Sequence, residues 1–186
     1  MADSVDRGEI QGQYDAVASG SRWLYLLAGV GVFNLIIRAL RLDFIIYSIY
    51  FTDLLTIAAM LPRFAASRIG LFSFCLVIIG LFALCGYFAR RRHRWAFIAG
   101  IALYGLDTML LFSHLFAGFD LGLALNILVH LFILYRVVVG AVAAWTLARI
   151  DREDRLLEQS LARSRAQVKH VMAGYDPFDD DSSPRA

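Results

Sequence analysis

The chain has 186 residues, of which 59% are hydrophobic and 18% are charged, and its formal net charge is +2. A soluble domain is roughly 45–50% apolar and about 25% charged, so this chain has too much apolar side chain for one small aqueous core and too little charge to cover it. The composition excludes an ordinary soluble enzyme, a disordered protein and a nucleic-acid-binding protein. It predicts an all-α, polytopic integral membrane protein.

Five apolar segments approach the length of a membrane-spanning helix, which is about 20 residues. The second of them, Phe44–Leu61, contains Asp53 and follows the first after a very short stretch, so it either crosses the membrane or forms a re-entrant or interfacial helix. We therefore predict a bundle of five transmembrane helices, or four if Phe44–Leu61 does not cross. The predicted spans are residues 23–40, 44–61, 69–89, 95–117 and 121–148.

Polar segments flank this predicted transmembrane domain of residues 23–148. Residues 1–22 form a polar, acidic N-terminal tail without the basic start and adjoining apolar core of a secretory signal. Residues 149–173 are charged and lack Gly and Pro, which predicts that the last helix continues into the cytoplasm. Residues 174–186 begin with Gly174, a typical helix stop, and are predicted to be an acidic disordered tail.

Basic residues predict the orientation, because short cytoplasmic loops are rich in Lys and Arg. The loop between the third and fourth spans contains Arg90, Arg91, Arg92 and Arg94, and further arginines follow the fifth span. Both regions are therefore predicted to be cytoplasmic, and with five spans the N-terminal tail lies outside. The loop arginines set the topology in our preferred interpretation, and they bind anionic lipid headgroups in the alternative. Seventeen of the 18 basic residues are Arg, a bias typical of a GC-rich bacterial genome, which suggests a bacterial inner membrane.

Several polar side chains lie inside the predicted spans, where an ionisable group is costly and often functional. When depth is counted from the outer ends of the spans at ~1.5 Å per residue, four of these side chains fall in one layer near the midplane. They are Asn34, Asp53, Asp107 and His130. The short connection between the last two spans makes Asp107 and His130 the favoured contact, and an Arg136–Asp107 ion pair competes with it. The predicted intramembrane polar cluster comprises Asn34, Asp53, Asp107, His114, Asn126, His130 and Arg136.

Three roles are open for this cluster. We favour a structural one, in which a buried polar pair fixes the register of two helices. The second is proton or ion transport by Asp53, Asp107 and His130, since histidine changes charge near neutral pH. The third is a metal-dependent enzyme with Asp107, His114 and His130 as ligands. The sequence contains neither HExxH nor GxSxG, so we predict no catalytic residue, no cofactor and no metal.

Small residues recur every four positions on the last two spans, a spacing that allows close helix packing. They are Ala96 and Gly100 on the fourth span and Gly140, Ala144 and Ala148 on the fifth. We favour packing within the chain over a surface for a second copy or another membrane protein. The predicted function is that of a non-enzymatic accessory membrane protein, whose partners are the lipid bilayer and a protein bound by these faces or by the 149–173 helix.

Overall fold

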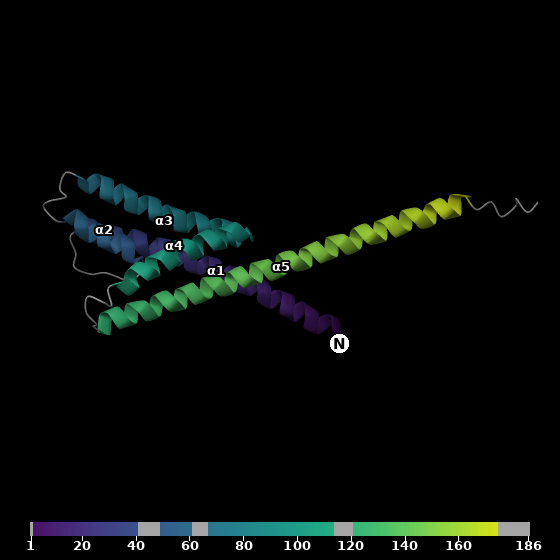
Figure 1. The fold of residues 1–186 in the computed structure, drawn as a ribbon, viewed down its shortest axis with the longest axis horizontal. Helices are drawn as coiled ribbons and strands as arrows, with labels where there is room; N and C mark the ends of the chain where they lie inside the picture. Colours follow the sequence, from purple (N-terminus) through teal and green to yellow (C-terminus); the bar gives the residue numbers. More distant parts are fainter. Residues whose placement is uncertain (1, 41–48, 61–66, 114–120, 175–186) are drawn as a thin grey trace, which may run out of the picture. The chain divides into compact units, whose positions relative to one another are not determined.

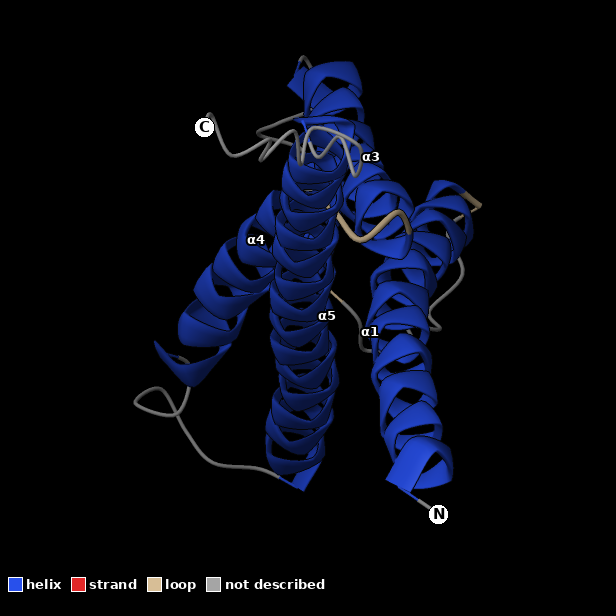
Figure 2. Cartoon of the chain, turned by 90° about the vertical axis from the view of Figure 1, so that its right-hand side faces the viewer, coloured by secondary structure: helices blue, strands red, loops and turns tan. Residues whose placement is uncertain are grey.

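The computed structural model describes residues 2–40, 49–60, 67–113 and 121–174, with the side chains of 2–7, 53, 56, 59, 60, 68 and 170–174 outside the description. Over these residues the chain forms α-helices and no strand (Figures 1 and 2). The predicted all-α fold is therefore confirmed for the described part of the chain. The helices are α1 (Ala2–Ala39), α2 (Tyr50–Met60), α3 (Arg68–Arg90), α4 (Arg94–Ser113) and α5 (Leu121–Gly174).

Four of these helices, α1, α3, α4 and α5, are long and apolar enough to cross a membrane. The helix α2 has 11 residues. At ~1.5 Å per residue it is about 16 Å long, roughly half of the ~30 Å hydrocarbon core of a bilayer. The described part of the second predicted span is thus too short to cross, and the prediction of five spans is not confirmed.

The chain divides into two compact units, Met1–Leu147 and Ala148–Ala186. The first unit contains α1 to α4 and the part of α5 up to Leu147, and it holds the buried core. The second unit contains the remainder of α5, in which every side chain from Arg152 to Lys169 is exposed.

The helices α1 and α3 of the first unit run antiparallel. A Cβ built on Gly31 of α1 would lie 2.9 Å from Ile79, whereas one built on Gly86 of α3 would lie 3.2 Å from the Tyr25 ring. The later residue of α1 thus contacts the earlier residue of α3, as expected for antiparallel helices. The chain between them starts and ends at the same end of the bundle, which favours the four-helix alternative for crossing.

A tight turn joins α3 to α4. The backbone N–H of His93 donates to Phe88 O at 3.0 Å, and that of Arg92 donates to Ala89 O at 2.9 Å. These are the two bonds of a Schellman motif, which places one residue in the left-handed region and usually uses glycine there. Here the residue is Arg92, with φ of 63°. The turn is thus built with a side chain at a position that L-residues adopt at a cost.

The N-terminal segment 1–22 is helical from Ala2 on and is the first part of α1. The side chain of Arg92 donates from Nη1 to the Tyr14 hydroxyl at 3.3 Å, and its guanidinium lies 5.3 Å from the Tyr14 ring centroid. The N-terminal half of α1 therefore lies beside the arginine-rich turn. The expectation that these two segments face opposite sides of a membrane is therefore not confirmed.

Small residues let α1 and α5 approach closely. A Cβ built on Gly140 would lie 2.9 Å from Gly20 Cα and 3.1 Å from the backbone oxygen of Ala16. On α4, a Cβ built on Gly100 would lie 3.0 Å from Leu24. The predicted small residues Ala96, Gly100, Gly140 and Ala144 are all buried in this first unit, whereas Ala148 belongs to the second. The first four thus serve packing within the chain.

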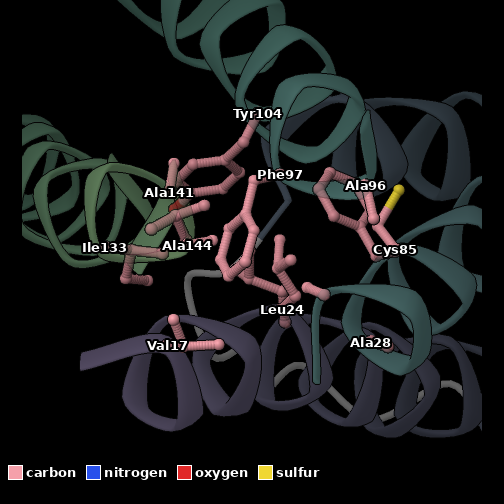
Figure 3. Close-up of a cluster of buried hydrophobic side chains, with 14 of the residues drawn as sticks. Val17, Leu24, Ala28, Cys85, Ala96, Phe97, Tyr104, Ile133, Ala141 and Ala144 are labelled. Carbon is pink, nitrogen blue, oxygen red and sulfur yellow. The ribbon is translucent and has the colours of Figure 1, made fainter. Parts of the chain in front are cut away.

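The core lies where α1, α3, α4 and α5 meet (Figure 3). Phe97 of α4 is fully buried at its centre, with Leu24 of α1 on one side and Ala144 of α5 on another. Phe82 of α3 meets Tyr104 edge-on, with ring centroids 6.1 Å apart. This apolar packing fixes the relative depth of α4 and α5, and it thereby places the polar residues of both helices at one level.

Candidate functional site

The centre of the polar cluster is a contact between α4 and α5. His130 Nε2 lies 3.2 Å from Asp107 Oδ2. Asp107 is 4% exposed and His130 is 0% exposed. The structure thus brings together the pair that the short connection between their helices predicts. A carboxylate buried to this extent requires hydrogen-bond donors, because an unpaired buried charge is strongly destabilising.

The remaining donors come from the first turn of α2. The backbone N–H of Tyr50 donates to Asp107 Oδ2 at 2.9 Å, and that of Phe51 donates to Oδ1 at 2.7 Å. The first N–H groups of a helix have no partner within the helix, and they carry a partial positive charge. Asp107 therefore acts as the N-terminal cap of α2 from a different helix, and it fixes where α2 begins.

A backbone oxygen and an aromatic ring position the imidazole of His130. Its Nδ1 lies 2.9 Å from the backbone oxygen of Asn126, one turn earlier on α5. Its ring stacks on the Tyr104 ring, with centroids 5.1 Å apart and planes 7° apart. Both ring nitrogens are thus in contact with oxygens, and the Tyr104 ring covers one face of the imidazole. A fixed ring is what a register lock between two helices requires.

Two buried polar atoms close to this pair in the chain have no hydrogen-bond partner among the described residues. They are the hydroxyl of Tyr104, which is fully buried, and Oδ1 of Asn126, which is 5% exposed. Buried polar atoms are normally paired with protein or with an ordered water. Each of the two atoms is therefore a position where an internal water would find a partner.

The other four residues of the predicted cluster are Asn34, Asp53, His114 and Arg136. Arg136 donates from Nη2 to Ser19 Oγ of α1 at 2.6 Å, so its partner is Ser19 rather than Asp107. Asn34 is 3% exposed on α1 and has an interaction of its own. Asp53 belongs to α2, but its side chain is outside the description, and His114 lies outside the described residues.

The predicted metal alternative, with Asp107, His114 and His130, is not assembled by the part of the chain that is described. In that part no three His, Cys, Asp or Glu side chains lie together in a group that could hold a metal ion. Both nitrogens of His130 already face oxygens at 3.2 Å or less. A metal ion would have to displace one of these contacts to reach the imidazole.

An apolar pocket of about 290 Å³ lies next to Asp107. The start of α2 lines it together with α3 and α4, and Asp107 is its one ionisable lining residue. Several lining residues, such as Val77 and Leu106, are also more than half exposed on the outer surface. The side chains that line the pocket around Asp107 are thus apolar. Its lining residues are Ile49, Phe51, Phe74, Val77, Ile78, Leu81, Phe82, Leu103, Leu106, Asp107 and Leu110.

The arginines of the α3–α4 turn form a separate, exposed cluster. Arg90, Arg91, Arg92 and Arg94 are all exposed. Arg91 lies over the Tyr87 ring, 4.6 Å from its centroid. A guanidinium within about 6 Å of an aromatic ring centroid is a favourable cation–π contact.

Four residues that contribute to the site are not identified from the sequence. The donors from Tyr50 and Phe51 are backbone groups, which no side-chain pattern reveals. Tyr104 stands one turn before Asp107, so its position on the same face of α4 could have been recognised. Ser19 lies in the segment that was predicted to be a tail, and its role depends on α1 extending through that segment.

Comparisons with protein-family models, with curated proteins and with solved structures find no match to this chain. The class of the protein therefore follows from its own geometry. It is an all-α chain over the described residues, with four helices that could cross a membrane and a buried carboxylate–imidazole pair at the point where α2, α4 and α5 meet.

Proposed function

We propose that the chain is a non-enzymatic integral membrane protein with four spans, α1, α3, α4 and the first part of α5. In this proposal α2 is a half-helix that enters and leaves from one side. The antiparallel packing of α1 and α3 and the contact between Tyr14 and Arg92 support it. Under the positive-inside rule the arginine-rich turn is cytoplasmic, and so are both ends of the chain. The arginine bias of the sequence supports a bacterial inner membrane.

The polar centre has a structural role in this proposal. All four polar atoms of the Asp107–His130 pair have a partner, and both residues are sealed from solvent. This sealed pair is the observation that carries the choice of a non-enzymatic function. A catalytic or metal centre needs an accessible atom, whereas a lock that holds α2, α4 and α5 together does not.

The association surface is the exposed helix of the second unit. Leu157, Leu161 and Val168 are 61%, 56% and 61% exposed. Their spacing of four and seven residues places them on one face of the helix. An exposed apolar stripe on a helix rich in charged residues is a pattern by which one helix docks onto another. We propose that the protein acts by binding a partner helix there, from a second copy or from another membrane protein.

Site-specific photocross-linking tests this association. A photoreactive phenylalanine analogue replaces Leu161 in the full chain, in intact membranes, and the matched control carries it at Ala166, on the opposite face. We expect a discrete cross-linked product from position 161 and none from position 166. Equal labelling at both positions, or none at 161, would contradict an association surface on this face.

Proton-coupled transport is the second candidate, and the position of α2 favours it. In many transporters the N-terminus of a half-helix points at an anionic group of the substrate near the midplane, and here the N-terminus of α2 points at the Asp107 carboxylate. Proton flux into liposomes that contain the wild-type chain or Asp107→Asn distinguishes the two candidates. A flux that Asp107→Asn abolishes in a chain that still folds supports transport, whereas equal flux from both chains argues against it.

A further inference from the structure

Each ring nitrogen of His130 faces an oxygen atom. Nδ1 lies 2.9 Å from the backbone oxygen of Asn126, which can only accept a hydrogen bond. Nε2 lies 3.2 Å from Asp107 Oδ2. Two hydrogen bonds require two protons, one in each contact. A neutral imidazole has one proton on its ring nitrogens and an ionised carboxylate has none, so together they supply only one.

We propose that the Asp107–His130 pair is a binding site for one additional proton. The backbone oxygen of Asn126 holds the first proton on Nδ1, so the additional proton lies between Nε2 and Asp107 Oδ2. The proposal rests on these contacts alone. It does not depend on the association surface. It goes beyond a purely structural role because it assigns a ligand, the proton, to the pair.

The surroundings of Asp107 place this proton on the imidazole. Both carboxylate oxygens accept backbone N–H groups at the positive end of α2, an arrangement that stabilises the ionised carboxylate. The pair is therefore an imidazolium beside a carboxylate, without net charge. This form suits a site that is sealed from water, since a single uncompensated charge there would be costly.

Loss of the additional proton breaks one of the two contacts. If the remaining proton stays on Nδ1, the lone pair of Nε2 faces an ionised oxygen. If it moves to Nε2, the lone pair of Nδ1 faces the Asn126 oxygen. In either case a repulsive contact replaces a hydrogen bond in a buried site. Because Asp107 also holds the first turn of α2, bound proton and docked α2 stabilise each other.

The other ionisable groups of the packed helices are few. The phenols of Tyr50 on α2 and Tyr104 on α4 lie within electrostatic range of Asp107. The segment of α3 between Ile69 and Ala89 contains no acidic or basic residue. The charged residue of α1 within residues 23–39 is Arg38. On α5 the next charged residue after His130 is Arg136, which donates a hydrogen bond to Ser19. On α2 the acidic residue is Asp53, whose side chain the structure does not describe.

The proton count can be measured directly. The full chain, labelled with ¹⁵N-histidine and with ¹³C-aspartate, is studied in micelles by NMR and infrared spectroscopy near neutral pH. We expect protons on both ring nitrogens of His130 and an ionised Asp107. A neutral ring beside a protonated Asp107 contains the same number of protons and also supports the site. An unprotonated ring nitrogen together with an ionised Asp107 would overturn the proposal.

Hydrogen exchange at the Tyr50 and Phe51 amides tests the link to α2, with α3 amides as the internal reference. When the pair loses its additional proton as the pH is raised, we expect their protection relative to α3 to fall about 10- to 100-fold in the wild type, the equivalent of one charge-assisted hydrogen bond. His130→Gln keeps a donor for Asp107 but does not titrate, so its relative protection stays constant. His93→Gln alters an exposed histidine and retains the wild-type fall.

A constant relative protection in the wild type, or the same fall in His130→Gln, would overturn the link between the proton and α2. If His130→Gln does not fold, the wild-type proton count and the His93→Gln comparison decide the question without it.

Discussion

Replacement of Gly140 by alanine tests the closest helix contact in the bundle. The new methyl carbon would lie 2.9 Å from Gly20 Cα, 3.0 Å from Phe97 Cε1 and 3.1 Å from the Ala16 oxygen. Carbon atoms in favourable contact lie about 3.5–4.0 Å apart, so the methyl group is up to about 1 Å too close. Two of the three atoms belong to the backbone of α1 and cannot turn away, so α1 and α5 must separate.

The size of the effect follows from two opposing terms. An overpacked site typically costs about 1–3 kcal/mol, and a rigid backbone neighbour favours the upper part of that range. Alanine in place of glycine within a helix returns about 1 kcal/mol. We therefore expect Gly140→Ala to lower the free energy of unfolding by about 1–2 kcal/mol.

The assay is reversible unfolding of the purified chain in mixed micelles, followed by circular dichroism. The matched control is Gly29→Ala on α1, where an added Cβ would meet nothing within 4 Å. We expect the control to be as stable as the wild type or more stable. A Gly140→Ala protein with the stability of Gly29→Ala would show that α1 and α5 do not pack through this contact.

Three further comparisons of variants test other parts of the structure. Asp107→Asn retains one acceptor for α2 but loses the charge, so we expect the free energy of unfolding, measured by the same assay, to fall by about 2–4 kcal/mol. An unchanged free energy of unfolding would contradict the buried ion pair. Phe97→Ala should lower the free energy of unfolding by about 3–5 kcal/mol because the Phe97 ring is fully buried. Phe33→Ala should lower it far less because Phe33 is 44% exposed, and equal losses would contradict the assignment of Phe97 to the core. Arg92→Gly should be about 1 kcal/mol more stable than Arg92→Ala because φ at this position is 63°, and the reverse order would contradict the left-handed turn.

The sequence predicts the long helices well, because continuous apolar runs of membrane length admit few alternatives. It also predicts that Asp107 and His130 meet, since a short connection ties α4 and α5 together at one end and the helical rise then sets the level of each residue. The choice between His130 and Arg136 as the partner of Asp107 needed the structure. The reason is Ser19, which holds Arg136 from a segment whose polar composition suggests a tail.

The number of spans could not be predicted for a different reason. Hydropathy measures whether a segment tolerates hydrocarbon, and α2 is apolar although its 11 residues would span only about half of a bilayer's hydrocarbon core. Its N-terminus is satisfied inside the bundle by Asp107, a residue more than 50 positions later in the chain. No local pattern in α2 contains that information, because the cap belongs to another helix.

Cysteine accessibility in right-side-out and inverted membrane vesicles tests the four-span proposal most directly. Single cysteines replace Gln11, Arg91, Glu158 and Ser67, one at a time, in a chain in which the buried Cys75 and Cys85 are alanine. The proposal predicts that a membrane-impermeant maleimide labels positions 11, 91 and 158 from one side and position 67 from the other. Labelling of positions 11 and 158 from opposite sides would contradict it, since an odd number of crossings would then separate the two ends of the chain.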